Sequence, residues 1–262
     1  MESITLNLNS PVLAVEGLSV ARSGNLIIDN LDLTINKGEF VGLVGPNGSG
    51  KSTLLLAILG IIKSHKGNVS IYGSQPLSPK LNGKIGWVSQ AASHLPEEIR
   101  ITVEELVKLG TISAKNMFFR RSADKKKIVD DAIEMVGLTE KRGFDVSKLS
   151  GGQKQRAVIA RALASNADFI VLDEPLVGVD RDSRNSLLKL LDDLCHQQNK
   201  TILMVSHDFT AIRKTSHRMI YLEDGIQFDG PAADFPSLDE LATLRGIKNV
   251  HSDHNHIDKE DL

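Results

Sequence analysis

The sequence predicts an α/β fold in which buried strands of a parallel sheet alternate with helices. Residues 169–172 and 201–205 are continuous apolar runs, typical of strands that are covered on both faces. Leucines at helical spacing between them predict a helix over 181–198. A third apolar run, 40–44, is followed by a glycine-rich loop and a predicted helix over 52–62. Strand–helix alternation of this kind indicates a sheet with helices packed on its faces.

The opening segment has a different pattern. Apolar and polar residues alternate in 13–16 and again in 31–35. A period of two predicts half-buried strands, as in an antiparallel sheet with one solvated face. We therefore expect an antiparallel β subdomain before the α/β core. A further short strand is expected over 69–72, ending at Gly73.

The middle third predicts a helical subdomain, over about residues 91–160, inserted between strands of the core. Thr102 and Glu105 have the spacing of a capping box, in which each residue bonds to the backbone of the other at a helix start. A second helix is predicted over 124–136, with its end at Gly137. Both helices lie in the proposed insertion.

Composition excludes few protein classes. The 262 residues are 41% apolar and 24% charged, which is ordinary for a globular protein. A net charge of −2 gives no reason to expect nucleic acid as a partner. No secretory signal is evident, and the longest apolar stretch, 54–62, is far shorter than the about 20 residues that cross a bilayer. A single cysteine, Cys195, suits a reducing cytosol, so a cytoplasmic protein is expected.

A phosphate-binding loop is the most specific motif. Gly45–Ser52 matches G-x-x-x-x-G-K-[ST], between a predicted buried strand and a predicted helix. Its glycines let backbone N–H groups surround phosphate oxygens, and the helix N-terminus adds partial positive charge. Lys51 can bridge the β- and γ-phosphates of ATP, and the Ser52 hydroxyl can ligate Mg²⁺. The predicted loop residues are Gly45, Pro46, Asn47, Gly48, Ser49, Gly50, Lys51, Ser52 and Thr53.

An acidic pair follows the buried strand over 169–172. Asp173 is expected to hold Mg²⁺, and Glu174 is the candidate general base for the attacking water. Two acids after a strand are common, and by themselves they favour a solvated strand end. Their combination with the phosphate loop favours a nucleotide hydrolase.

The pentapeptide Leu149–Gln153, LSGGQ, resembles the signature of the ABC ATPase family. This resemblance implies a P-loop NTPase core with an antiparallel β subdomain and an inserted helical subdomain. It also implies that the pentapeptide caps ATP held by the phosphate loop of another copy, so the working unit would be a homodimer. The residues concerned are Ser150, Gly151, Gly152 and Gln153.

Three single residues match further family positions. The resemblance implies that Gln90 senses Mg²⁺ and water, that Asp180 contacts the opposite subunit, and that His207 reaches the γ-phosphate. The implied catalytic set is Glu174, His207 and Gln90, and the implied metal set is Ser52, Gln90 and Asp173.

The resemblance extends over about residues 12–230. We therefore expect an ATPase domain over 1–230 and a polar, partly disordered extension over 231–262. Its histidines, His251, His254 and His256, suggest metal sensing, but a polar terminal tail favours solvated residues with no metal role. The segment 118–121 could contact a permease or pack within the helical subdomain.

Two positions depart from the family pattern. Arg22 occupies the place where many members have an aromatic residue beneath adenine. A guanidinium can stack on a purine and donate hydrogen bonds, but a solvated turn arginine fits equally well. Leu176 replaces the usual threonine after Asp-Glu-Pro, with little expected effect.

The cargo is suggested by smaller similarities. Segments 85–90, 101–103, 178–180 and 204–208 resemble the branch that imports zinc or manganese. This implies membrane permease subunits, an extracytoplasmic metal-binding receptor and a place on the inner face of the cell membrane. The alternatives are another cargo, such as an iron–siderophore or an exported compound, and a non-transport ABC ATPase.

Overall fold

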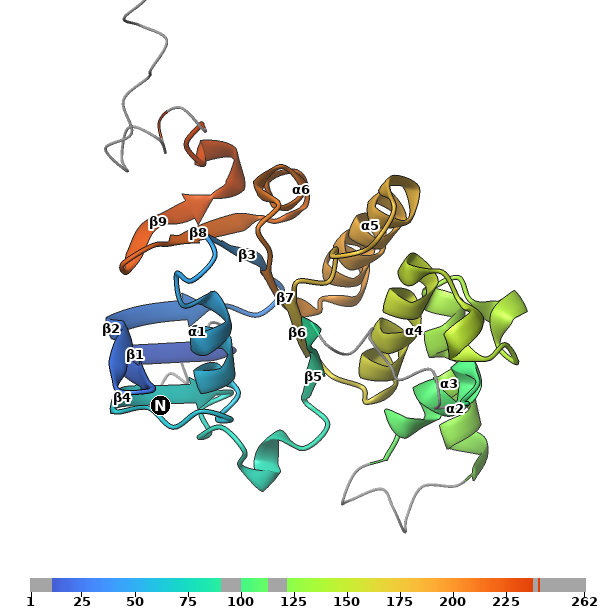
Figure 1. Cartoon of the computed structure of the whole chain (residues 1–262). Helices are drawn as coiled ribbons and strands as arrows, with labels where there is room; N and C mark the ends of the chain where they lie inside the picture. Colours follow the sequence, from blue (N-terminus) through green and yellow to red (C-terminus); the bar gives the residue numbers. More distant parts are fainter. Residues whose placement is uncertain (1–10, 91–99, 113–121, 238–239, 241–262) are drawn as a thin grey trace, which may run out of the picture.

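The computed structural model describes residues 11–90, 100–112, 122–237 and 240. Within these ranges the strands form two sheets, and the helices are divided between them and a separate helical group (Figure 1). None of the helices in the described ranges has the length and apolar character needed to cross a membrane.

The central sheet has six strands in the order β5-β6-β7-β3-β8-β9. Its strands are β3 (Phe40–Val44), β5 (Ile85–Val88), β6 (Phe169–Asp173), β7 (Thr201–Val205), β8 (Arg218–Leu222) and β9 (Ile226–Pro231). All neighbours pair in parallel except β8 and β9. The predicted strands β3, β6 and β7 are confirmed, and each is buried along its whole length. The strands β5, β8 and β9 were not predicted.

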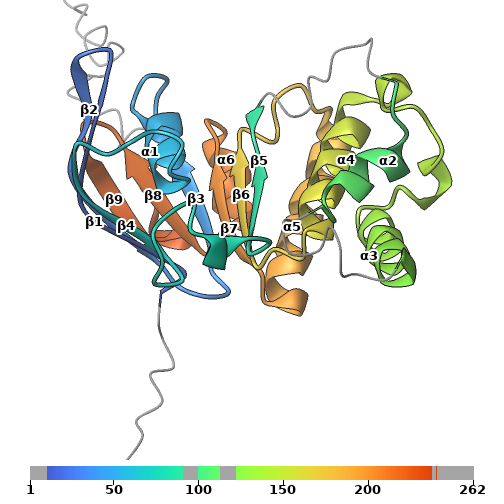
Figure 2. The same cartoon turned by 90° about the horizontal axis from the view of Figure 1, so that it is seen from below.

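The predicted antiparallel subdomain is a three-stranded sheet of β1 (Leu13–Arg22), β2 (Asn25–Ile35) and β4 (Lys66–Ile71). The helix α1 (Lys51–Ile58) packs between this sheet and the central one, as Figure 2 shows. Its side chains Leu54, Leu55 and Ile58 are fully buried in a core that both sheets share. The helix ends at Ile58 rather than at 62, because Gly60 adopts a left-handed φ of 73°.

The helical group contains α2 (Val103–Leu109), α3 (Ser122–Met135) and α4 (Gly151–Ala164), which pack on one another. The capping box is confirmed: the Glu105 amide donates to Thr102 Oγ1 at 3.2 Å, and the Thr102 amide donates to Glu105 Oε2 at 2.8 Å. Residues 91–99, at the start of the predicted insertion over 91–160, lie outside the described residues. So do residues 118–121, where a permease contact was considered.

Two more helices cover the central sheet, α5 (Arg181–Gln198) and α6 (Phe209–Thr215). The first has the predicted bounds. They share one apolar core with the helical group and with the strands that they cover. Short 3-10 helices connect the elements, at Pro79–Leu81, Thr139–Lys141, Val146–Lys148 and Ala232–Asp234.

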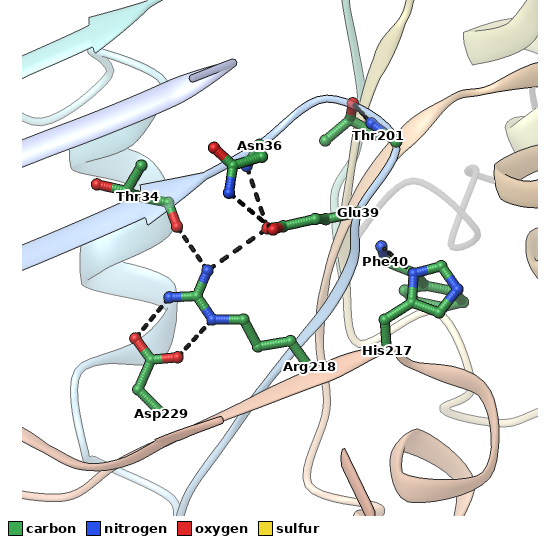
Figure 3. Close-up of polar contacts among 9 residues, drawn as sticks. Thr34, Asn36, Glu39, Phe40, Thr201, His217, Arg218 and Asp229 are labelled. Carbon is green, nitrogen blue, oxygen red and sulfur yellow. Dashed lines mark hydrogen bonds and ion pairs between the residues drawn. The ribbon is translucent and has the colours of Figure 1, made fainter. Parts of the chain in front are cut away.

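Arg218 joins the two sheets (Figure 3). Its guanidinium makes two hydrogen bonds to Asp229 on β9, with N···O distances of 2.5 and 2.6 Å. It also donates to the Thr34 carbonyl at 2.8 Å and lies 3.4 Å from Glu39 Oε2. Glu39 accepts in turn from the side-chain amide of Asn36 at 2.8 Å. The turn between β2 and β3 is therefore fixed to the far edge of the central sheet.

The chain beyond β9 stays in contact with the core at first. Phe235 is buried and its ring meets that of Phe228 edge-on, with centroids 5.3 Å apart. The boundary near residue 230 stays a prediction. The tail histidines at 251, 254 and 256 lie outside the described residues.

Candidate nucleotide-binding site

One cavity, of about 520 Å³, gathers most of the predicted site residues. It opens where β3 and β6 end, beside the N-terminus of α1. Its lining consists of Arg22, Ile27, Asn47, Gly48, Gly50, Lys51, Ser52, Thr53, Gln90, Glu174, Val177 and His207. Residues far apart in the sequence are thus brought to the carboxyl ends of the parallel strands, which is where such sheets bind ligands.

The phosphate loop wraps around the side chain of its own lysine. Lys51 begins α1, and its ammonium group donates to the carbonyls of Gly45 at 2.9 Å and Pro46 at 2.8 Å. Burial lowers the pKa of Lys51, whereas the nearby charges of Glu174 and Asp173 raise it. A buried cation of this kind is suited to an anionic ligand at the start of a helix.

Glycine is required in this loop for close packing as well as for access to the backbone. Gly45 has φ 155°, and a Cβ there would lie 2.2 Å from the Leu222 carbonyl oxygen. Gly50 has φ 94°, and its Cβ would lie 2.8 Å from the Ile28 side chain. The sequence indicated the exposed N–H groups. The contacts with Leu222 and Ile28 come from strands that only the fold brings near.

Asp173 ends β6 and presents a buried carboxylate to the loop. Its Oδ1 atom has no hydrogen-bond partner among the described residues. Burial raises the pKa of Asp173 and the charge of Glu174 adds to this, while Lys51 and a hydrogen bond with Ser52 lower it. An unpaired buried carboxylate oxygen beside a serine hydroxyl fits the oxygen donor set that Mg²⁺ prefers.

Glu174 and His207 contact each other directly. Glu174 Oε2 lies 2.9 Å from His207 Nδ1. The glutamate side chain is only 11% exposed, whereas the imidazole is 60% exposed. Glu174 also has a φ of 52°, a left-handed conformation that is costly for a non-glycine residue. Its amide donates to the Val205 carbonyl at 2.9 Å, so the adjacent strand β7 holds it in this conformation.

The predicted adenine and water-sensing positions also line the cavity. Arg22 is exposed at the end of β1, and Gln90 follows β5. Ile27 on β2 lines the cavity too and was not predicted. It is 37% exposed, so part of its apolar side chain is accessible from solvent. The apolar run 26–28 interrupts the alternation of β2, and that interruption was the signal available in the sequence.

The pentapeptide is not part of this cavity. Ser150 caps α4: its hydroxyl accepts from the Gln153 amide at 3.3 Å, and Gln153 Oε1 accepts from the Ser150 amide at 3.2 Å. The two glycines pack closely on the start of α5. A Cβ on Gly152 would lie 2.4 Å from Ser183 Cβ, and one on Gly151 would lie 2.7 Å from the Gly178 carbonyl oxygen.

Asp180 caps α5 and is likewise outside the cavity. Its carboxylate accepts from the Ser183 amide at 3.0 Å, and this hydrogen bond is the main cause of the lowered pKa of Asp180. One ion pair near the site was not predicted: Arg184 donates to Asp208 at 2.8 Å and so links α5 to the start of α6.

The fold and the cavity define a P-loop nucleotide-binding protein. The family model described as ABC transporter matches residues 28–177. The chain belongs to the ABC transporter family, as an ATP-binding subunit with ATPase activity.

Two curated relatives and one solved structure are similar to this chain. The zinc uptake system ATP-binding protein ZurA of Listeria innocua is 35% identical over 86% of this chain and 87% of its own length. The manganese transport system ATP-binding protein MntB of Listeria innocua is 38% identical over 83% of this chain and 89% of its own length. A dimeric post-hydrolysis structure of the ATP-binding cassette MJ0796, bound to ADP and Pi, has a TM-score of 0.73 and 30% identity. It covers 85% of this chain and 100% of its own.

Proposed function

We propose that this chain is the ATP-hydrolysing subunit of an importer of a divalent metal ion, zinc or manganese. The ATPase part is carried by one observation: Lys51, Glu174 and His207 line a single cavity. The metal cargo is supported by the relatives named for zinc and manganese uptake, and by the sequence segments that resemble the same branch.

The roles of the site residues follow from their positions. Backbone N–H groups of the loop and the ammonium of Lys51 bind the phosphates. Ser52 and Asp173 hold Mg²⁺, with Gln90 beside it, and the ion when bound neutralises charge on the phosphates. Glu174 accepts a proton from the attacking water, and His207 positions that carboxylate through the 2.9 Å contact while its exposed edge faces the γ-phosphate.

The site is completed by a second copy of the chain. Ser150 and Gly151 are exposed at the N-terminus of α4, which can bind an anion and does not line the cavity. In a homodimer with the two ATP molecules between the copies, this N-terminus caps the nucleotide of the partner. Asp180 lies at the start of α5, next to the pentapeptide, where it contacts the opposite subunit.

The remaining partners follow from family membership. The dimer binds membrane permease subunits at the inner face of the cell membrane, and a metal-binding receptor delivers the ion from outside. Closure of the dimer on ATP drives the permease, and hydrolysis reopens it.

Uptake measurements test the cargo. Cells that lack the gene should lose accumulation of radiolabelled zinc or manganese, and the wild-type chain should restore it. The Glu174→Gln variant, expressed at the same level, should not. Normal uptake of both metals in the deletion strain would refute metal import, and loss of iron–siderophore uptake instead would establish the first alternative. Unchanged transport of every cargo would favour a non-transport role.

A further inference from the structure

A pair of histidines lies outside the nucleotide site, where α5 ends and β8 begins. His196 Nε2 and His217 Nε2 face each other at 3.2 Å. Their rings meet edge-on, with centroids 4.8 Å apart and planes at 88°. Asp192 lies one turn before His196 on α5, and its Oδ1 atom is 3.1 Å from His196 Nδ1. One donor atom from each of the three residues lies within 4.8 Å of the others.

We propose that Asp192, His196 and His217 form a binding site for a zinc ion. Zinc–imidazole bonds of about 2.0–2.1 Å with tetrahedral angles place two nitrogens about 3.3 Å apart. The 3.2 Å between the two Nε2 atoms is close to that separation. An ion between them would have both imidazoles as ligands and water at its open positions.

Asp192 supports the site from the Nδ1 side of the His196 ring, away from the ion. A carboxylate that accepts from Nδ1 of a ligating histidine fixes the ring and makes its other nitrogen a better donor. Asp192 is placed to do this for His196. All three residues are partly or fully exposed, so an ion and its water molecules can enter from solvent.

The second histidine couples the site to the central sheet. His217 Nδ1 accepts from the Phe40 amide at 3.2 Å, at the start of β3 (Figure 3). Ligation through Nε2 leaves the ring proton on Nδ1, so the zinc-bound form gives up this hydrogen bond. The phosphate loop follows the end of β3, whereas Phe40 is at its start. Because β3 and β8 run in parallel, His217 lies at this same amino end of the sheet. The site is therefore separate from the nucleotide cavity.

The donor set selects the metal. Two imidazole ligands suit zinc, whereas manganese and magnesium prefer sites built from oxygen donors. The neighbouring Cys195 is not a ligand: its thiol is buried and donates to the Gly38 carbonyl at 3.1 Å.

Zinc titration of the full chain with a competing chelator, without nucleotide or Mg²⁺, tests the proposal. To isolate the site, His251, His254 and His256 are replaced by serine in every protein compared. In this background zinc should bind at least tenfold more tightly than manganese. His196→Ala should weaken zinc binding at least tenfold, and Asp192→Asn by about 10–100-fold. Replacement of the exposed His65 by alanine is the matched control and should change nothing.

Because His217 also supports the Phe40 amide, its own variant could fail to fold, and a spectroscopic measurement replaces it. The amide resonance of Phe40 should shift when zinc is added to the background protein and should not shift in His196→Ala. Equal zinc affinity of the background protein and His196→Ala would overturn the proposal. So would manganese binding as tight as zinc binding.

Discussion

Glu174 Oε2 and His207 Nδ1 lie 2.9 Å apart, at the ends of two adjacent parallel strands. Asp173 at the end of β6 pairs with Val205 at the end of β7, so Glu174, one residue further on, and His207, two residues further on, leave the sheet close together. The contact therefore follows from strand order and register, and it joins two residues that are 33 positions apart.

Replacement of Glu174 by glutamine tests its role as the base. The amide keeps the size of the side chain but cannot accept the proton from water, so turnover should fall by about 10²–10⁴. ATP binding should remain, and an ATP-bound dimer should accumulate. Phosphate release and light scattering measure the two effects. A variant that hydrolyses ATP at the wild-type rate would contradict the assignment.

Replacement of Asp173 by asparagine should stabilise the nucleotide-free protein while abolishing activity. The raised pKa of Asp173 means that the folded state disfavours its ionised form, so removal of the charge at neutral pH should increase the free energy of unfolding by about 0.5–2 kcal/mol. The difference in free energy of unfolding between variant and wild type should disappear as the pH falls and the wild-type carboxyl is protonated. Thermal unfolding from neutral to acidic pH measures this difference. A difference that does not change with pH would refute the electrostatic explanation.

Substitution of Arg22 tests whether the guanidinium contacts adenine. Arg22 lines the cavity next to Ile27. If it stacks on the base, Arg22→Ala should weaken ATP binding several-fold and leave kcat unchanged, whereas Arg22→Tyr should restore affinity. Fluorescent-nucleotide titration provides the dissociation constants. Equal affinities in all three proteins would show that the arginine is a solvated turn residue.

A methyl group at Gly152 should clash with α5. Since its Cβ would lie 2.4 Å from Ser183 Cβ, Gly152→Ala should cost about 1–3 kcal/mol of stability. Ser183→Gly removes the clashing atoms, so the double variant should recover part of the loss. A double-mutant cycle in urea measures this coupling. Additive effects would mean that the close contact does not determine the need for glycine.

Loss of the Arg218 side chain should loosen the junction of the two sheets. Arg218→Ala leaves Asp229 and Glu39 without their cation, and we expect a loss of about 1–3 kcal/mol. Arg218→Lys keeps the charge but cannot form the two-pronged pair with Asp229, so it should be intermediate. Denaturant unfolding distinguishes the three proteins. A lysine variant as stable as wild type would show that only the positive charge of Arg218, and not its two-pronged pairing, stabilises the junction.

Short-range patterns in the sequence determined much of this protein. The strands β3, β6 and β7, the bounds of α5 and the capping box at Thr102 could be predicted because each depends on a continuous run or a fixed local spacing. The phosphate loop is also a local motif, so Lys51 and Ser52 were identified together with their neighbours.

Only the tertiary structure decided which of these elements meet. The strand order β5-β6-β7-β3-β8 places segments from opposite ends of the chain side by side, and it creates the contact between Glu174 and His207. The need for glycine at 152 and the pairing of His196 with His217 have the same origin. Pairing between distant segments depends on how all the buried surfaces pack at once, and no local spacing in the sequence records it.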